Sequence, residues 1–465
     1  MSKTERFLAD LVEIVGTKAL VTDAEALEPH VTEWRNVLHG RALAMVCPGS
    51  TTEVADVVRL CSHEGIAIVP QGGNTGLCGG AVPDESGQQL ILSLARLNRI
   101  RSIDAEDFSM VAEAGCVLAT LQQEARAVDR YFPLSLSAEG SCQIGGNLAT
   151  NAGGINVIRY GTARQQVLGL EVVLADGSII DGLRSLHKDT AGYDLKQLFI
   201  GSEGTLGIIT AATLRLYPDP GETTTLLITL PDAGSAVSLL ARMRAALGDR
   251  IESFELISRF ALQLVERHIA GVGLPHELSG DWFVLAELAV GEEAESLAKF
   301  LEDAVDAGQL SDAVIAKNIA EAESLWRVRH AISEAQKYEG PSIKHDISVP
   351  VSRMQEFLEH CSKRLQRLEP SARPVIFGHV GDGNLHYNLT VPEELAGDAQ
   401  RVARITTTIY DLVAELGGSF SAEHGVGVTK KAHLEHYRGS TELDLMRRLK
   451  RALDPQNLLN PGKVI

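Results

Sequence analysis

Residues 42–73 read ALAMVCPGSTTEVADVVRLCSHEGIAIVPQGG and predict a strand, a helix and a second strand. Ser50 and Glu53 have the spacing of a capping box at a helix start. Gly65 stands where that helix should end. The second strand then runs directly into the glycine-rich loop PQGGNTGLCGG at residues 70–80. The stretch therefore predicts the first part of an α/β domain, in which a glycine-rich loop follows a strand.

The loop at 70–80 is one of three glycine-rich segments, with EGSCQIGGNLATNAGG at 139–154 and GYDLKQLFIGSEGTLGIIT at 192–210. Backbone amides of such loops can hold phosphate oxygens. The first loop is neither a Rossmann G-x-G-x-x-G nor a Walker A sequence. No acidic residue stands about 20 residues after a glycine fingerprint to bind a ribose. Each segment alone is also compatible with a surface loop, but three in one domain favour a long dinucleotide, and FAD over NAD.

The chain has 465 residues, of which 45% are hydrophobic, so two or more domains are expected. A linker with two prolines lies around 218–223. Before it the pattern is strand-rich and mixed, and after it strands alternate with helices without a parallel-sheet signature. We expect an FAD-binding domain with a helical lead-in at 1–220, a substrate- and metal-binding domain at 221–440, and a segment at 441–465 that returns to the first domain.

The net charge is −18, with 43 basic and 61 acidic residues, which excludes nucleic acid and anionic membrane surfaces as general partners. The six cysteines form no C-x-x-C pair, so a zinc knuckle and a disulfide framework are both disfavoured. The first 15 residues do not read as a signal or transit peptide, and no apolar run is long enough to span a bilayer. We therefore expect a cytoplasmic protein without an integral membrane segment.

Residues 378–388, GHVGDGNLHYN, predict a hairpin with Asp382 and Gly383 in a two-residue type I′ turn. That register places His379 directly opposite His386, with Cβ atoms roughly 4.5–5.5 Å apart. Asn388 shares their face of the sheet. Two imidazoles at this spacing can bind one metal ion. The alternative is a surface hairpin with incidental histidines.

Residues 417–427, GGSFSAEHGVG, offer Glu423 as a third metal ligand and His424 as a base at the end of an expected strand. The two could equally form a pair on a loop. On a predicted helix, Arg329 and Ser333 are four residues apart and share a face. Lys344 lies on a predicted strand, and an arginine with a lysine could bind a carboxylate. A solvated surface is the alternative for each of these residues taken alone.

Together these segments resemble the FAD-linked 2-hydroxy acid dehydrogenases of the vanillyl-alcohol-oxidase flavoprotein superfamily. Within that family the chain is most similar to enzymes that oxidise D-2-hydroxyglutarate. The resemblance covers the chain from about residue 40 to the terminal NLLNPGKV. It rests on the three glycine-rich segments, RYG (159–161), GHVGDGNLHYN and SAEHGVG.

The resemblance implies an α+β fold with a non-Rossmann FAD-binding domain of two subdomains and a cap domain built on an antiparallel sheet. It implies that His379, His386 and Glu423 bind a divalent metal, usually zinc, and that His424 is the catalytic base. It assigns Arg329, Ser333, Lys344 and Asn388 to the substrate. The positions implied to bind FAD are Gly72, Gly73, Asn74, Thr75, Gly76, Gly140, Ser141, Gly145, Gly146, Asn147, Thr150, Asn151, Gly153, Gly154, Glu203, Gly204, Ile209 and Asn460.

Two positions depart from the family pattern. Asn74 stands where some members carry a histidine that binds flavin covalently, so a non-covalent FAD is expected. Ser333 replaces a threonine, which keeps the hydroxyl but weakens the expectation for the second carboxylate.

The activity implied by the resemblance is oxidation of a D-2-hydroxy acid, with D-2-hydroxyglutarate as the first candidate and D-lactate or another monocarboxylic acid as the alternative. Electrons would pass to electron-transfer flavoprotein or a quinone-linked acceptor, and a homodimer is the candidate assembly. A non-catalytic flavin-binding subunit and a zinc hydrolase are the remaining alternatives.

Overall fold

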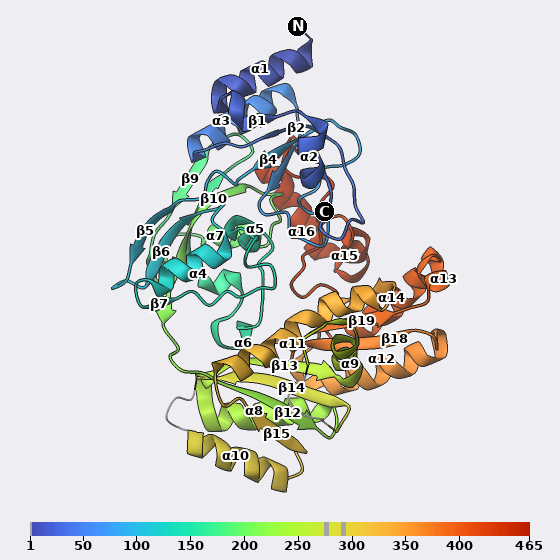
Figure 1. Cartoon of the computed structure of the whole chain (residues 1–465). Coiled ribbons are helices and arrows are strands. Elements are labelled where there is room, and N and C mark those ends of the chain that lie inside the picture. Colours follow the sequence, from blue (N-terminus) through green and yellow to red (C-terminus); the bar gives the residue numbers. More distant parts are fainter. Residues whose placement is uncertain (1, 274–278, 290–293) are drawn as a thin grey trace. The chain divides into compact units, whose positions relative to one another are not determined.

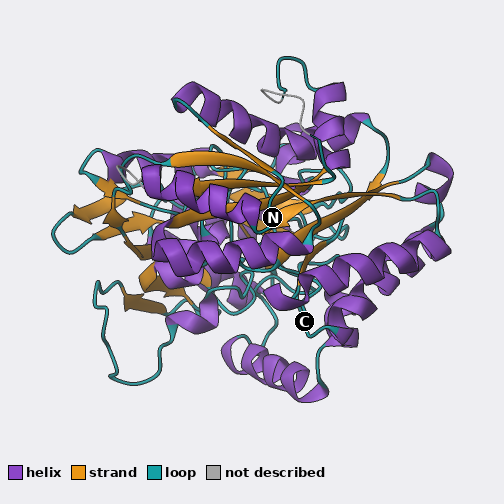
Figure 2. Ribbon diagram, turned by 90° about the horizontal axis from the view of Figure 1, so that it is seen from below, coloured by secondary structure: helices purple, strands orange, loops and turns teal. Residues whose placement is uncertain are grey.

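The computed structural model describes residues 2–273, 279–289 and 294–465, and helices and strands recur throughout them (Figure 2). The chain divides into two compact units. The first unit comprises residues 1–154, 161–219 and 423–465, and the second comprises 155–160 and 220–422. The later boundary therefore lies between residues 422 and 423, whereas the sequence predicted it between 440 and 441. The expected mixed α+β class is confirmed.

The first unit begins with the predicted strand–helix–strand segment. Its helix starts where the Ser50 hydroxyl accepts the Glu53 amide, and it ends at Gly65 in a left-handed conformation with φ +70°. The two flanking strands lie in parallel on either side of a third strand. The resulting four-stranded sheet has the order β1-β2-β4-β3. Its elements are α1 (Lys3–Val15), β1 (Leu20–Val21), α2 (Ala24–Val31), β2 (Ala42–Val46), α3 (Thr51–Glu64), β3 (Ile68–Gln71) and β4 (Gln89–Ser93).

A second, antiparallel sheet of five strands completes the two-subdomain arrangement, in the order β5-β6-β10-β8-β9. Apolar side chains of α4 and α5 fill one core with its inner strands. A short two-stranded ribbon pairs β11 with β7. The elements are β5 (Ile100–Asp104), β6 (Ser109–Glu113), α4 (Leu118–Arg126), β7 (Arg130–Tyr131), α5 (Ile144–Ala149), β8 (Val167–Val173), β9 (Ile179–Gly182), α7 (Lys196–Phe199), β10 (Ile208–Arg215) and β11 (Tyr217–Pro218).

A buried charge network joins the two subdomains of the first unit. Arg101 donates from both terminal nitrogens to Glu171, at 2.9 and 3.0 Å, and from Nε to Glu113 at 3.2 Å. Thr51, at the start of α3, donates to the same Glu171 carboxylate at 2.5 Å. The Glu113 side chain is fully buried. Both carboxylates therefore depend on arginine to offset their burial.

The C-terminal tail belongs to the first unit, after α15 (Lys431–Tyr437) and α16 (Ser440–Leu453). Ile68 donates its amide to the Leu458 carbonyl, and its own carbonyl accepts the Asn460 amide, each at 2.8 Å. The buried Lys463 ammonium donates to the carbonyls of Gly79 and Val82. The tail thus extends the pairing of β3 and contacts the first glycine-rich segment.

The second unit is built on one antiparallel sheet of eight strands: seven follow the order β15-β12-β14-β13-β18-β19-β16, and β17 pairs with β19. The predicted antiparallel cap sheet is confirmed. The strands are β12 (Thr224–Leu230), β13 (Ile251–Ser258), β14 (Trp282–Leu288), β15 (Asp312–Ile315), β16 (Ser342–Ile343), β17 (Asp346–Ser348), β18 (Arg373–His379) and β19 (Asn384–Thr390).

Helices α9 and α11 pack on one face of this sheet (Figure 1), where their apolar side chains meet those of β12, β13, β14 and β18. Among the described residues, no helix combines the length and apolar character that crossing a membrane requires. The helices of this unit are α6 (Val157–Tyr160), α8 (Gly234–Leu247), α9 (Arg259–His268), α10 (Ala294–Asp306), α11 (Ile319–Tyr338), α12 (Met354–Leu368), α13 (Glu393–Ala396) and α14 (Ala399–Glu415).

Candidate active site

A pocket in the first unit brings the three glycine-rich segments together, and His424 also lines it. Each segment overlaps a core element of this unit: the first begins at the end of β3, the second contains α5 and the third runs into β10. The residues of the predicted FAD set that line the pocket are Gly72, Gly73, Asn74, Thr75, Gly76, Gly145, Gly146, Asn147, Thr150, Glu203, Gly204 and Ile209.

The pocket depends on glycine for two different reasons. A Cβ atom on Gly73 would lie 2.2 Å from the Ser141 carbonyl oxygen, and one on Gly145 would lie 2.6 Å from the Ala114 Cβ. The first two glycine segments therefore pack against neighbouring protein too closely for any side chain. At Gly146, by contrast, an added Cβ meets no protein atom within 4 Å. That glycine leaves open space on the pocket wall.

The chemistry of the pocket suits a bound dinucleotide. The Gln143 side-chain oxygen on its wall is buried and has no hydrogen-bond partner in the described part of the chain. Buried acceptors are normally satisfied, so a donor from a bound group fits here. Asn74 adopts a positive φ of +52° and donates from its amide to the carbonyls of Pro29 and Thr32. Its side chain therefore holds the loop, and an amide has no nucleophilic ring nitrogen with which to bond a flavin.

Glu203 connects the pocket to the segment that carries His424. Its carboxylate accepts the amides of Val426 and Gly427 at 2.7 and 2.8 Å. Burial raises the pKa of this carboxyl. The Asn460 side chain donates to the carbonyl of Glu203 at 2.8 Å. Glu203 therefore holds the loop after His424 with its side chain, a contact that sequence analysis did not anticipate.

The other residues of the predicted FAD set lie outside this pocket wall. The Asn151 side-chain oxygen accepts from Thr162 Oγ1 and from the Arg164 amide, at 2.9 and 3.0 Å. The Gly154 amide donates to Glu423 Oε2 at 3.3 Å. The predicted residues outside the lining are Gly140, Ser141, Asn151, Gly153, Gly154 and Asn460.

Glu423 and His424 lie beside each other in the first unit, with Glu423 Oε1 3.7 Å from His424 Nε2. The strand expected before them is not formed. Ser419 makes only an isolated bridge with Ser348 of the second unit's sheet.

The hairpin of the second unit has a different register from the predicted one. Phe377, and not His379, lies opposite His386. A type I′ turn needs positive φ at both central residues, but of Asp382 and Gly383 only Gly383 has one, at +82°. Asp382 instead accepts the Asn384 amide through its side chain, and the turn widens. The error is two residues, so both histidines still share one face, with ring centroids 5.8 Å apart.

Asp346 lies on the same face of the sheet, on strand β17, which pairs with β19. It lies opposite His386 in the pairing of β17 with β19, and its Oδ1 is 4.0 Å from His386 Nδ1. Asn384 Nδ2 donates to Oδ1, and the Ala422 amide donates to Oδ2 at 3.2 Å. Aspartate and histidine are both residue types that bind metal ions. Asp346 was not among the predicted site residues, although it lies two residues after Lys344.

Glu255 on β13 is the second acidic residue that sequence analysis missed. It lies opposite His379, and its Oε1 is 2.5 Å from His379 Nδ1. Its Oε2 accepts from Arg329 Nε and Nη2 at 2.8 and 2.7 Å. Burial alone would raise the pKa of this carboxyl, but the charges of His379 and Arg329 lower it to about 2. The only sequence signal was a glutamate inside the apolar strand IESFELIS.

The four predicted substrate residues are placed differently. Arg329 is buried on α11 and stacks over the Phe377 ring at 4.8 Å, whereas Ser333, one turn later, is exposed. Lys344 lies between β16 and β17 rather than inside a strand. Asn388 shares the face of the histidines, as predicted, and its amide donates to Gln336 of α11. The structure thus brings Arg329 and Asn388 to the face that carries His379 and His386.

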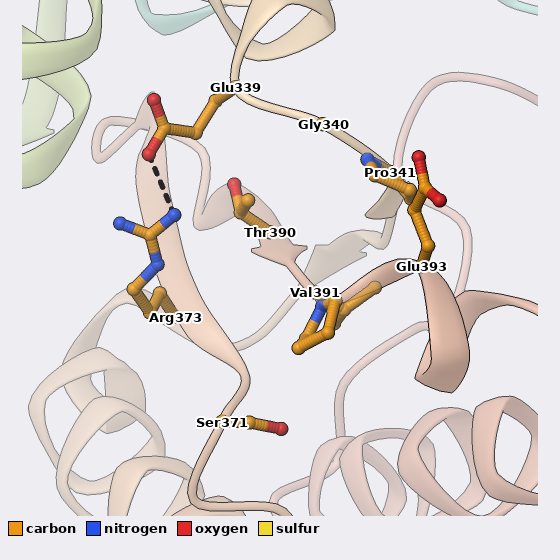
Figure 3. Close-up of a pocket in the computed structure, with 9 residues that line it drawn as sticks. Glu339, Gly340, Pro341, Ser371, Arg373, Thr390, Val391 and Glu393 are labelled. Carbon is orange, nitrogen blue, oxygen red and sulfur yellow. Dashed lines mark hydrogen bonds and ion pairs between the residues drawn. The ribbon is translucent and has the colours of Figure 1, made fainter.

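A different pocket of the second unit lies near the ends of β18 and β19 and is lined by none of the predicted site residues (Figure 3). Glu339 and Arg373 form an ion pair on its wall at 2.7 Å. Glu339 also pairs with Arg267 and His268. Because its arginine already faces a carboxylate, this pocket is a poor match for an anionic substrate.

Comparison with known proteins finds FAD-linked families along this chain, in agreement with a flavin-binding role for the glycine-rich pocket. A family model described as "FAD binding domain" matches residues 42–182, and one described as "FAD linked oxidases, C-terminal domain" matches residues 219–464. D-2-hydroxyglutarate dehydrogenase, mitochondrial, from Bos taurus is 40% identical over 99% of this chain and 84% of its own length. D-2-hydroxyglutarate dehydrogenase from Xanthomonas citri pv. viticola is 40% identical over 99% and 97%, respectively.

Two solved structures share the fold at low sequence identity. p-Cresol methylhydroxylase with substrate bound superimposes with a TM-score of 0.75 at 17% identity, covering 99% of this chain and 96% of that chain. Alkyldihydroxyacetonephosphate synthase also gives a TM-score of 0.75 at 17% identity, covering 98% and 85%. These matches confirm the fold predicted from the resemblance.

Proposed function

The chain belongs to the FAD-linked oxidases, among relatives named D-2-hydroxyglutarate dehydrogenase, and from this membership we propose that it oxidises D-2-hydroxyglutarate to 2-oxoglutarate. The observation that carries the proposal is 40% identity to those relatives along nearly the whole chain. D-Lactate or another monocarboxylic 2-hydroxy acid is the second candidate, because the exposed Ser333 offers no buried group for a second carboxylate.

FAD is proposed to bind without a covalent bond in the pocket of the first unit. Bound FAD would supply the acceptor for the two electrons of the oxidation. Gly73 and Gly145 allow the loops to pack, and Gly146 leaves room beside them. Asn74 supports non-covalent binding because its amide holds two backbone carbonyls and offers no bonding atom to a flavin ring. Cytoplasmic location, a homodimer and electron-transfer flavoprotein or a quinone-linked acceptor remain predictions.

A divalent cation, with zinc as the first candidate, is proposed to bind His379, His386 and Glu423. Such an ion would polarise the hydroxyl oxygen and the α-carboxylate of the substrate. His379 and His386 lie on one face of the cap sheet, and their residue types suit zinc. Glu423 directly follows Ala422, whose amide donates to Asp346 Oδ2 at 3.2 Å. Asp346 is a further candidate ligand beside His386.

The chain's own residues are assigned the following roles. His424, which lines the pocket, would accept the hydroxyl proton of the substrate. Within the described part of the chain, Arg329 bonds to Glu255 through Nε and Nη2, and its Nη1 donors would bind the distal carboxylate. Asn388 and Lys344 would complete the polar side of the substrate site, with Ser333 as a peripheral contact.

An anaerobic flavin-reduction screen tests the proposal. The FAD-loaded enzyme is mixed with D and L forms of 2-hydroxyglutarate, lactate and related acids, with and without EDTA. We expect D-2-hydroxyglutarate to bleach the flavin absorbance fastest, and the L form to leave it unchanged. EDTA should stop the reaction while the flavin stays bound. An enzyme that stays oxidised with every acid would instead be a non-catalytic flavin-binding subunit.

A further inference from the structure

Glu255 occupies an unusual position for a carboxylate in the second unit. It lies in the middle of β13, between β14 and β18 in the sheet, and its side chain is fully buried. A buried carboxylate carries a large desolvation cost unless its oxygens are satisfied. Each Glu255 oxygen serves one neighbour: Oε1 faces His379 at 2.5 Å, and Oε2 faces Arg329 at 2.7 and 2.8 Å.

The contact between Glu255 and His379 determines which nitrogen of the His379 ring carries the proton. A carboxylate paired with an arginine only accepts hydrogen bonds, so the proton of a neutral His379 ring must lie on Nδ1. The lone pair is then on Nε2, which is the form a metal ion binds. Carboxylates that hold metal-binding histidines in this way orient the ring and raise its basicity.

The contact with Arg329 restrains a long and flexible side chain. An arginine side chain loses rotamer entropy when it is held in one conformation. Here the Phe377 ring supports the face of the guanidinium at 4.8 Å, and Glu255 binds its Nε and Nη2 edge. The Arg329 side chain is therefore already held in one conformation before a ligand binds, so binding does not have to order it. The Nη1 donors keep a fixed direction.

We infer that Glu255 is a positioning residue that serves two subsites at once: it sets the ring form of His379 for the metal and the orientation of Arg329 for the distal carboxylate. This inference rests on the proposed function. It differs from a purely structural ion pair because it couples metal affinity to discrimination between dicarboxylic and monocarboxylic substrates. Glu255 itself touches neither the metal nor the substrate.

The matched control is Glu252 on the same strand. Its side chain is also buried, and it pairs with Arg159 and Tyr160 rather than with a proposed ligand. Glu255→Gln and Glu252→Gln both replace a buried carboxylate by an amide of the same size. Only Glu255→Gln can reverse the hydrogen bond to His379, because an amide can donate to Nδ1 and move the ring proton to Nε2. Glu255→Asp keeps the charge with a shorter reach.

The experiment titrates chelator-treated, FAD-loaded enzyme with zinc and then measures KM for D-2-hydroxyglutarate and D-lactate at saturating zinc. Glu255→Gln should weaken zinc binding by about 10–100-fold, the usual effect of losing such a carboxylate. Its KM for D-2-hydroxyglutarate should rise more than its KM for D-lactate. Glu255→Asp should fall between wild type and Glu255→Gln, and Glu252→Gln should match wild type in both measurements.

Zinc affinity in Glu255→Gln equal to that in Glu252→Gln would overturn the inference. If Glu255→Gln does not accumulate as folded holoenzyme, the same comparison with Glu255→Asp decides it. Failure of the proposed function has a different signature, because wild-type enzyme would then bind no zinc or would remain fully active after chelation.

Discussion

Replacing Gly73 with alanine tests whether close packing between the first two glycine-rich segments forms the flavin pocket. The added Cβ would lie 2.2 Å from the Ser141 carbonyl oxygen and 3.1 Å from the Cys142 Cα. Ordinary contacts begin at 3.4 Å, so the shortfall at the oxygen is 3.4 − 2.2 = 1.2 Å. Both neighbouring atoms are backbone, and the clash cannot be relieved by a side-chain rotation.

The cost follows from that geometry. One of the two segments must move by about 1 Å, and such overpacking destabilises a protein by about 1–3 kcal/mol. For a unit of this size, each kcal/mol lowers the Tm by about 2–4 °C. The backbone angle of Gly73 is one that alanine can adopt, because its φ is not positive. The loss therefore comes from crowding alone, and it falls on the wall of the pocket.

The assay compares Gly73→Ala with Gly146→Ala, each as FAD-free protein and after titration with FAD. Gly146 also lines the pocket, but its Cβ would meet no protein atom within 4 Å. As Gly146 lies in α5, alanine should leave the FAD-free protein as stable as wild type or more stable by up to about 1 kcal/mol. Gly73→Ala should lose both stability and FAD affinity. Wild-type Tm and wild-type FAD affinity in Gly73→Ala would refute the packing argument.

Three further outcomes are expected. Arg329→Ala should raise KM for D-2-hydroxyglutarate far more than for D-lactate, and equal changes would count against the diacid substrate. Burial lowers the pKa of Lys463 from 10.5 to about 8, so between these pH values the unfolded state binds one more proton than the folded state. The free energy of unfolding should therefore rise with pH across that window. Denaturant titrations should show this rise in wild type and not in Lys463→Met. Arg101→Ala should lower stability by about 3 kcal/mol in denaturant unfolding, because Glu171 would stay buried after losing its arginine partner.

The glycine-rich pocket could be predicted from sequence because its signal is local. Each segment adjoins a strand or helix whose apolar pattern is clear, and the three sets of glycines converge once those elements pack. The separate roles of Gly73 and Gly146 could not be predicted. Gly73 is required because the Ser141 carbonyl, 68 residues later in the chain, packs against it. Gly146 instead borders open space, and only the three-dimensional structure distinguishes the two cases.

The histidine face was predicted in part. Alternation along a strand has a period of two, so a register error of two residues left His379 and His386 on the same face. The partners of His379 were missed because a glutamate in a strand is usually solvent-exposed. Glu255 is buried by residues 74 and 124 positions away, Arg329 and His379, and no local pattern reports such contacts.

The assignment of residues 155–160 to the second unit has a consequence for domain exchange between relatives. The chain passes between units not only at 219 and 422 but also on both sides of this short piece. Arg159 and Tyr160 in it bond to Glu252 of the cap sheet. A chimera that takes only 220–422 from a relative would separate these partners. Two grafts, one of them six residues long, are needed to transplant this cap as a working module.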